Sequence, residues 1–152
     1  MTIYLDLSCD LKNLLVSNII KNRILVTPKQ IKLNKKEGNL CLYYELIGSF
    51  LLSGEYLRIH SPSAETKGHG KKQAVLQYGK EFVKISSVES IGNYALRLSF
   101  SDDHNSGIFT WKYLYDLAIN YDKYWGDYLE ALSKSGKYRD PNIETIEFIE
   151  KT

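Results

Sequence analysis

The sequence predicts an α+β domain, in which a compact and mostly antiparallel β-sheet carries helices from the C-terminal part of the chain packed on it. Residues 30–52 and 82–109 alternate apolar and polar side chains with the period of two that is typical of strands. Residues 111–132 instead repeat apolar side chains at helical spacing. Because strands precede helices rather than alternating with them, α+β is favoured over a wound parallel sheet. The length of 152 residues fits one such domain.

A short helix and a β fragment are expected before the main sheet. Asp10 is a suitable N-terminal cap, and apolar side chains follow it at helical spacing as far as Ile19. Residues 24–26 form an apolar run typical of a strand. Pro28 ends this element, because proline disfavours helical backbone geometry in the residue before it.

The first antiparallel hairpin is expected over residues 30–46, with a glycine-containing turn at residues 35–39. Its second strand keeps alternating as far as Leu46. A third strand, residues 50–52, extends the same sheet after a turn at Gly48-Ser49.

The middle of the chain is less regular. One or two turns of helix are expected from Gly54 until Pro62 ends them. Residues 64–73 form a polar loop around Gly68-His69-Gly70, and a strand is expected again at Val75-Leu76.

A second antiparallel group follows. Residues 82–91 form a strand with a bulge expected at Ser86-Ser87, and residues 94–100 show the clearest alternation in the chain. Turn-forming residues at 102–107 then lead into residues 108–109, so these last two strands are predicted to pair as a hairpin.

The C-terminal third is predicted to be helical. Thr110 caps this region and Gly136 ends it. The aromatic stripe that starts at Tyr121 is either a shelf for a ligand or a packing surface, and packing onto the sheet is the favoured interpretation. The acidic tail from Pro141 carries apolar residues at helical spacing and docks either on the body or on a partner.

Composition argues against several classes of protein. The formal charge of +2 hides a gradient from a basic beginning to an acidic end of the chain, but no segment is strongly basic, so nucleic acid is not an expected partner. No apolar run approaches the roughly 18 residues that span a bilayer, so no membrane association is expected. Cys9 and Cys41 lie in no spacing that would hold structural zinc, and we expect both to be free thiols in a reducing cytoplasm.

Three histidines, His60, His69 and His104, supply the side chains that titrate near neutral pH when unperturbed. The motifs of serine hydrolases, P-loop proteins, dinucleotide-binding enzymes and zinc proteases are absent from the sequence. Imidazole and carboxylate groups together suit a Zn or Fe ion. The candidate site is therefore a metal ion held by His60, His104 and a carboxylate, either Glu65 or Asp103.

Several unusual strings occur in one order along the chain: Glu55–Glu65, Gly68-His69-Gly70, Ile91–Leu96 and Phe100–Trp111. In this order they resemble a bacterial family of unknown function that is similar to the N-terminal domain of gamma-butyrobetaine hydroxylase. The resemblance covers residues 28–136. It leaves residues 1–27 as an N-terminal extension and residues 137–152 as an acidic C-terminal tail.

The resemblance implies a compact, mostly antiparallel α+β domain. In the hydroxylases this domain resembles a zinc module with three cysteines and one histidine. His104 falls on the histidine, whereas Ser61, Ser63 and Thr66 fall on the cysteines, and neutral hydroxyls are poor zinc ligands. The iron and 2-oxoglutarate centre of the hydroxylases belongs to a separate domain, so we do not expect their activity here.

Members of the family are also joined to iron-sulfur carrier ATPases. The resemblance therefore implies an accessory role in iron or iron-sulfur metabolism, with such an ATPase or another iron-metabolism protein as partner. We expect a non-catalytic metal-binding or protein-binding module. The alternatives are a small enzyme that uses His104 as general base in a pocket between residues 56–65 and 102–107, and a pure protein-interaction domain.

Overall fold

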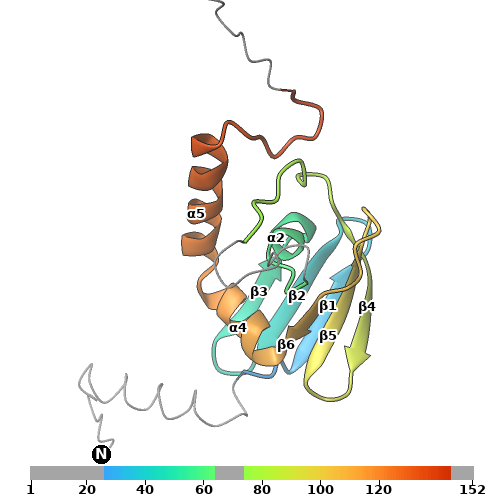
Figure 1. The fold of residues 1–152 in the computed structure, drawn as a ribbon. Helices are drawn as coiled ribbons and strands as arrows, with labels where there is room; N and C mark the ends of the chain where they lie inside the picture. Colours follow the sequence, from blue (N-terminus) through green and yellow to red (C-terminus); the bar gives the residue numbers. More distant parts are fainter. Residues whose placement is uncertain (1–25, 64–73, 145–152) are drawn as a thin grey trace, which may run out of the picture.

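The computed structural model describes residues 26–63 and 74–144. Within this part of the chain, two three-stranded antiparallel sheets and three helices form an α+β fold, which confirms the predicted fold class (Figure 1). The expected N-terminal helix, the loop at residues 64–73 and the end of the acidic tail lie outside the described residues. None of the described helices is long and apolar enough to cross a membrane.

The first sheet contains β1 (Gln30–Asn34), β2 (Asn39–Tyr44) and β3 (Gly48–Leu52), in that spatial order. Alternation along β2 and β3 sends every second side chain into the core. The inward side chains that are almost fully buried are Leu40, Leu42, Tyr44 and Leu52.

The second strand is shorter than its alternation predicts. It ends at Tyr44, and the expected continuation to Leu46 is wrong, because Leu46 lies in the turn and is 68% exposed. The chain reverses just before Gly48, whose φ of 89° is accessible to glycine at little cost. The position of this turn, and not the apolar pattern, therefore sets the end of β2.

The short helix α2 (Gly54–Ile59) follows β3 directly, as predicted. Ser53 caps it, since its Oγ accepts a hydrogen bond from the Tyr56 N–H (3.1 Å). Gly54 approaches a neighbouring segment so closely that a Cβ atom would lie 2.4 Å from the carbonyl oxygen of Val83. This close approach holds α2 against residues 83–84.

The second sheet contains β4 (Ile85–Ile91), β5 (Ala95–Phe100) and β6 (Ile108–Thr110). A register shift between Ile85 and Ser87 confirms the predicted bulge, and the pairing of β5 with β6 confirms the predicted hairpin. The Ile85 N–H donates to the carbonyl of Gly38 (3.1 Å), which ties this sheet to the turn between β1 and β2.

The strand expected at Val75-Leu76 is wrong, because residues 74–84 form no strand in the structure. Val75 is half-exposed, and its carbonyl accepts a hydrogen bond from the Gln77 side chain (3.3 Å) in place of a strand neighbour. Two apolar side chains that are not buried together contribute too little hydrophobic free energy to offset the entropy cost of ordering a strand.

The predicted helical region forms α4 (Trp111–Ile119) and α5 (Tyr121–Lys134). Thr110 caps α4 through a hydrogen bond from the Tyr113 N–H (3.2 Å). Gly136, with a φ of 58°, ends α5 as predicted, and the Lys137 N–H donates to the carbonyl of Leu132 (3.0 Å).

The aromatic stripe of α5 packs mainly on α2, which Figure 1 shows between α5 and the sheets. The ring centroids of Tyr56 and Tyr121 lie 4.6 Å apart, and those of Tyr56 and Trp125 lie 6.3 Å apart. The stripe is therefore a packing surface, although Tyr121 and Trp125 also line a groove beside α2.

Candidate functional site

The end of α2 and the turn that follows β5 lie against each other. The Oγ of Ser61 is 2.8 Å from the Nε2 of His104, 43 residues further along the chain. Close by, Arg58 and Lys80 each donate a hydrogen bond of 2.8 Å to the Oδ2 of Asp102. Burial alone raises the pKa of the Asp102 carboxyl, but the hydrogen bonds and charges of Lys80 and Arg58 together lower it below its ordinary value.

His104 is held in a buried position by its turn. Asp103 has a φ of 64°, and the Phe100 N–H donates to the carbonyl of His104 (2.9 Å). The residue is 6% exposed, and its ring centroid lies 5.9 Å from that of Phe100. A Cβ atom at Gly107 would lie 2.1 Å from the Oγ of Ser61. The junction of Ser61 with the turn is therefore tightly packed.

His60, directly before Ser61, has a different environment. Its Nδ1 lies 2.8 Å from the carbonyl oxygen of Tyr56, so this nitrogen carries the proton and donates it. The imidazole packs between the rings of Tyr56 (4.6 Å between centroids) and Tyr124 (5.9 Å). Burial lowers the pKa of His60, an effect that the hydrogen bond to Tyr56 partly opposes.

The structure thus places the predicted metal ligands in two environments. His104 faces Ser61, whereas His60 contacts side chains of α2 and α5. Asp103 is exposed, and Glu65 lies outside the described residues. In the described ranges, no group of three or more histidine, cysteine, aspartate or glutamate residues is arranged to hold a metal ion. A Zn or Fe site at these residues stays a prediction.

The environment of His60 predicts a pH effect on stability. The folded protein holds its pKa below the ordinary value of 6.5, so the unfolded chain binds a proton first as the pH falls. The free energy of unfolding should therefore decrease as the pH falls below 6.5. Among the described residues, the rings of Tyr56 and Tyr124 pack on the imidazole, the hydroxyl of Tyr124 is bonded to Asp116, and Asp127 lines the same groove as His60.

Urea unfolding of the wild type and of His60→Phe at pH 7.5 and pH 5.5 measures this effect. The loss of stability between the two pH values should be smaller in His60→Phe. Equal losses in both proteins would show that other groups cause the pH dependence.

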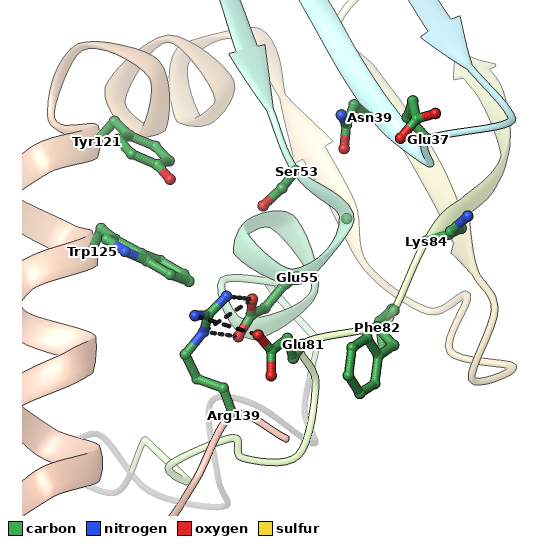
Figure 2. Close-up of a pocket in the computed structure, with 12 residues that line it drawn as sticks. Glu37, Asn39, Ser53, Glu55, Glu81, Phe82, Lys84, Tyr121, Trp125 and Arg139 are labelled. Carbon is green, nitrogen blue, oxygen red and sulfur yellow. Dashed lines mark hydrogen bonds and ion pairs between the residues drawn. The ribbon is translucent and has the colours of Figure 1, made fainter. Parts of the chain in front are cut away.

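A groove of about 380 Å³ opens between α5, the beginning of α2 and residues 81–84 (Figure 2). We call it the Arg139 groove. Its lining residues are Glu37, Asn39, Ser53, Gly54, Glu55, Glu81, Phe82, Val83, Lys84, Tyr121, Trp125 and Arg139.

An ion pair lies at the centre of one side of this groove, as Figure 2 shows. Arg139 donates from Nε to Oε1 of Glu55 (3.0 Å) and from Nη2 to Oε2 (2.7 Å), and the Glu55 side chain is only 4% exposed. The guanidinium carbon of Arg139 lies 4.9 Å from the centroid of the Trp125 ring. Glu81 lies 3.6 Å from the same guanidinium.

Sequence reasoning missed this pair. Arg139 and Glu55 are 84 residues apart, and Arg139 falls in the part of the chain that was predicted to be a tail. Its position is fixed by backbone hydrogen bonds, from the Gly79 N–H to the carbonyl of Tyr138 (2.9 Å) and from the Glu81 N–H to the carbonyl of Arg139 (3.0 Å). No residue spacing in the sequence indicates these contacts.

Comparisons with known proteins agree with this architecture. One structure determined by NMR in solution is 48% identical to this chain with a TM-score of 0.70, and the match covers 82% of this chain and 98% of the other. A second NMR structure is 39% identical with a TM-score of 0.62, and the match covers 82% of this chain and 95% of the other. A crystal structure of a protein of unknown function from Acidithiobacillus ferrooxidans, which belongs to the DUF971 family, is 32% identical with a TM-score of 0.50; the match covers 61% of this chain and 93% of that one. None of the curated proteins matches. The family model described as gamma-butyrobetaine hydroxylase-like, N-terminal, matches residues 31–115, and the chain therefore belongs to this family.

Proposed function

We propose that this protein is a non-catalytic accessory module that binds a partner protein through the Arg139 groove. One observation carries the proposal. Phe82, which lines the groove, is 61% exposed, and the half-buried rings of Tyr121 and Trp125 line the same groove. Aromatic side chains are enriched at the centres of protein-protein interfaces, and Trp and Tyr are frequent among the residues that contribute most to binding.

The charges around the groove support a partner with a basic rim. The Arg139 guanidinium is already paired with Glu55, and the Lys84 ammonium donates to the carbonyl of Lys36 (2.7 Å). Glu37 is exposed and forms no ion pair within the described residues. Together with Glu81 it leaves negative charge at the edge of the groove, which favours lysine or arginine on the partner.

The surroundings of His104 support a non-catalytic role. Ser61 and His104 have the residue types of a nucleophile and its base, but both are almost completely buried, and Gly107 packs directly on the Ser61 hydroxyl. The nearby Asp102 carboxylate accepts from Arg58, and His104 does not line the Arg139 groove. A substrate would have to displace this packing to reach the pair.

The first partner class to test comes from the family resemblance: an iron-sulfur carrier ATPase or another protein of iron metabolism. The protein would then act on iron handling only through its partner. The Arg139 groove provides the surface on which this proposal can be tested by substitution.

Phe82→Ser should weaken partner binding about thirtyfold or more, which corresponds to the roughly 2 kcal/mol that defines an interface hot spot. The stability of the isolated protein should change little, because Phe82 is mostly exposed. Immobilised wild type and variant are compared for retention of a purified iron-sulfur carrier ATPase and of proteins from the native cell.

Tyr94→Ser is the matched control, since Tyr94 is also an exposed aromatic residue, 53% exposed, and does not line the groove. It should retain the same partners as the wild type. Equal retention by all three proteins would rule out the groove as the contact surface.

A metal ion at His60, His104 and Glu65 or Asp103 is the second candidate function. It is favoured by the 2.8 Å contact of His104 with Ser61, which brings this imidazole to the segment that carries His60. Glu65 is four residues beyond Ser61 in the sequence, close to the same segment.

His104→Ala should remove tightly bound metal from protein that is purified without an affinity tag. Metal content is measured by mass spectrometry, and circular dichroism checks that the variant is folded. Equal metal content in a folded His104→Ala protein and in the wild type would exclude His104 as a ligand.

A further inference from the structure

A second groove, of about 420 Å³, lies between α5, the end of α2 and residues 74–77. We call it the His60 groove. Its volume is in the range of small-molecule sites. Its apolar lining comes mainly from Ile59, Val75, Leu76 and Ala131, and the rings of Tyr124 and Tyr128 complete it.

Three polar groups of this groove offer hydrogen-bond acceptors, while the Gln77 amide and the Tyr128 hydroxyl can also donate. His60 donates from Nδ1 to the carbonyl of Tyr56, so the Nε2 of the neutral ring carries a lone pair. Tyr124 donates its hydroxyl proton to Asp116 (2.9 Å), which leaves its oxygen as an acceptor. Asp127 adds a carboxylate, close enough to Tyr124 that its charge contributes to the raised pKa of that hydroxyl.

The Nε2 of His60 has no partner among the described residues and is not fully buried. No hydrogen bond joins it to a described residue, and the side-chain atoms that are buried without a partner in the described ranges are the hydroxyls of Tyr44 and Tyr128. Tyr113 bonds the carbonyl of His60 (2.7 Å), so the residue is held at its backbone and at Nδ1. The acceptor is thus positioned before any ligand arrives.

Positive charge is lacking among the described residues that line the groove. Two cations of the described residues contact lining residues without lining the groove themselves: the Lys123 ammonium lies 5.8 Å from the centroid of the Tyr124 ring, and Arg58 contacts Gln77 (3.4 Å) while it is paired with Asp102. A groove with three acceptors, one full negative charge and aromatic faces is complementary to a cation that also donates hydrogen bonds.

We propose that the His60 groove binds a small organic molecule in which a primary ammonium is attached to an apolar body. The ammonium donates to His60 Nε2 and pairs with the Asp127 carboxylate. The apolar body lies against Ile59, Val75 and the tyrosine rings. This site is separate from the Arg139 groove and does not depend on the function proposed for it.

The test uses 2-phenylethylamine as the probe, titrated into the full-length ¹⁵N-labelled protein and followed by NMR. We expect saturable shifts of the amide signals of residues 59–60, 75–77 and 124–131. Binding of 2-phenylethanol, which has the same body without the charge, should be at least fivefold weaker, and 3-phenylpropionate should not bind.

Two variants locate the interaction. Asp127→Asn should weaken amine binding at least fivefold and leave 2-phenylethanol unchanged, and His60→Phe, which keeps a ring between the two tyrosines, should also weaken the amine. Asp122→Asn removes the same charge from an exposed position of α5 outside the groove, and it should bind like the wild type. Equal binding of amine and alcohol, or an equal response of Asp127→Asn and Asp122→Asn, would overturn the proposal.

Discussion

Replacing Arg139 with alanine is expected to lower the free energy of unfolding by about 3 kcal/mol, the lower end of the range for breaking a buried ion pair. We take the lower end of that range because solvent screens the Arg139 side chain, which is 36% exposed, whereas the Glu55 side chain is only 4% exposed. The substitution leaves the Glu55 carboxylate buried without the hydrogen bonds from Arg139 and removes the contact with Trp125. Urea unfolding at pH 7 measures the loss.

Lys29→Ala is the control for this prediction. Lys29 pairs with Glu45 at 2.8 Å, close to the 2.7 Å of the Arg139–Glu55 pair, but both of its side chains are more than half exposed. Its loss should lower the free energy of unfolding far less than the loss of Arg139, because ion pairs between exposed side chains contribute little to stability. Similar effects of the two substitutions would mean that the Glu55 pair does not hold the C-terminal segment in place.

Gly107→Ala is expected to lower the free energy of unfolding by about 3 kcal/mol, at the upper end of the usual cost of overpacking. The new Cβ would lie 2.1 Å from the Ser61 Oγ and 3.2 Å from the Cδ of Pro62. Ser61 has little room to move away, because it is buried and contacts His104. The comparison is again made by urea unfolding.

A double-mutant cycle shows whether the Ser61 hydroxyl causes this cost. Ser61→Ala alone should lose about 1 kcal/mol, the typical value of one hydrogen bond. The double variant Ser61→Ala/Gly107→Ala should be more stable than the sum of the two losses predicts, because the closest clash is gone. Strictly additive losses would contradict the packing described for this junction.

The fold was largely predictable because its signals are local. The alternation along β5, the cap at Thr110 and the stop at Gly136 each depend on a few neighbouring residues, and all three are in the structure. The end of β2 was not predictable from alternation, since Leu46 continues the apolar pattern into an exposed turn. The strand predicted at Val75-Leu76 is absent for a related reason, because two apolar residues do not indicate whether a neighbouring strand is available for pairing.

The candidate sites were less predictable because they depend on long-range contacts. The sequence singled out His60 and His104 as candidate ligands. It did not indicate that the His60 imidazole faces α5 whereas the His104 imidazole is buried against Ser61. Arg139 and Glu55 gave no signal at all, because their contact depends on how the C-terminal segment pairs with residues 79–81. The exposure of Phe82, which carries the proposed function, likewise becomes visible only in the fold.

The most direct test of the proposed function is to titrate ¹⁵N-labelled protein with the partner that the wild type retains, and to follow the backbone amide signals by NMR. We expect the largest changes at residues 37–39, 81–84 and 121–125, around the Arg139 groove. The outer face of the first sheet, where Cys41 lies beside Leu51, should change little. Changes confined to that face, with the groove signals unaffected, would contradict the account.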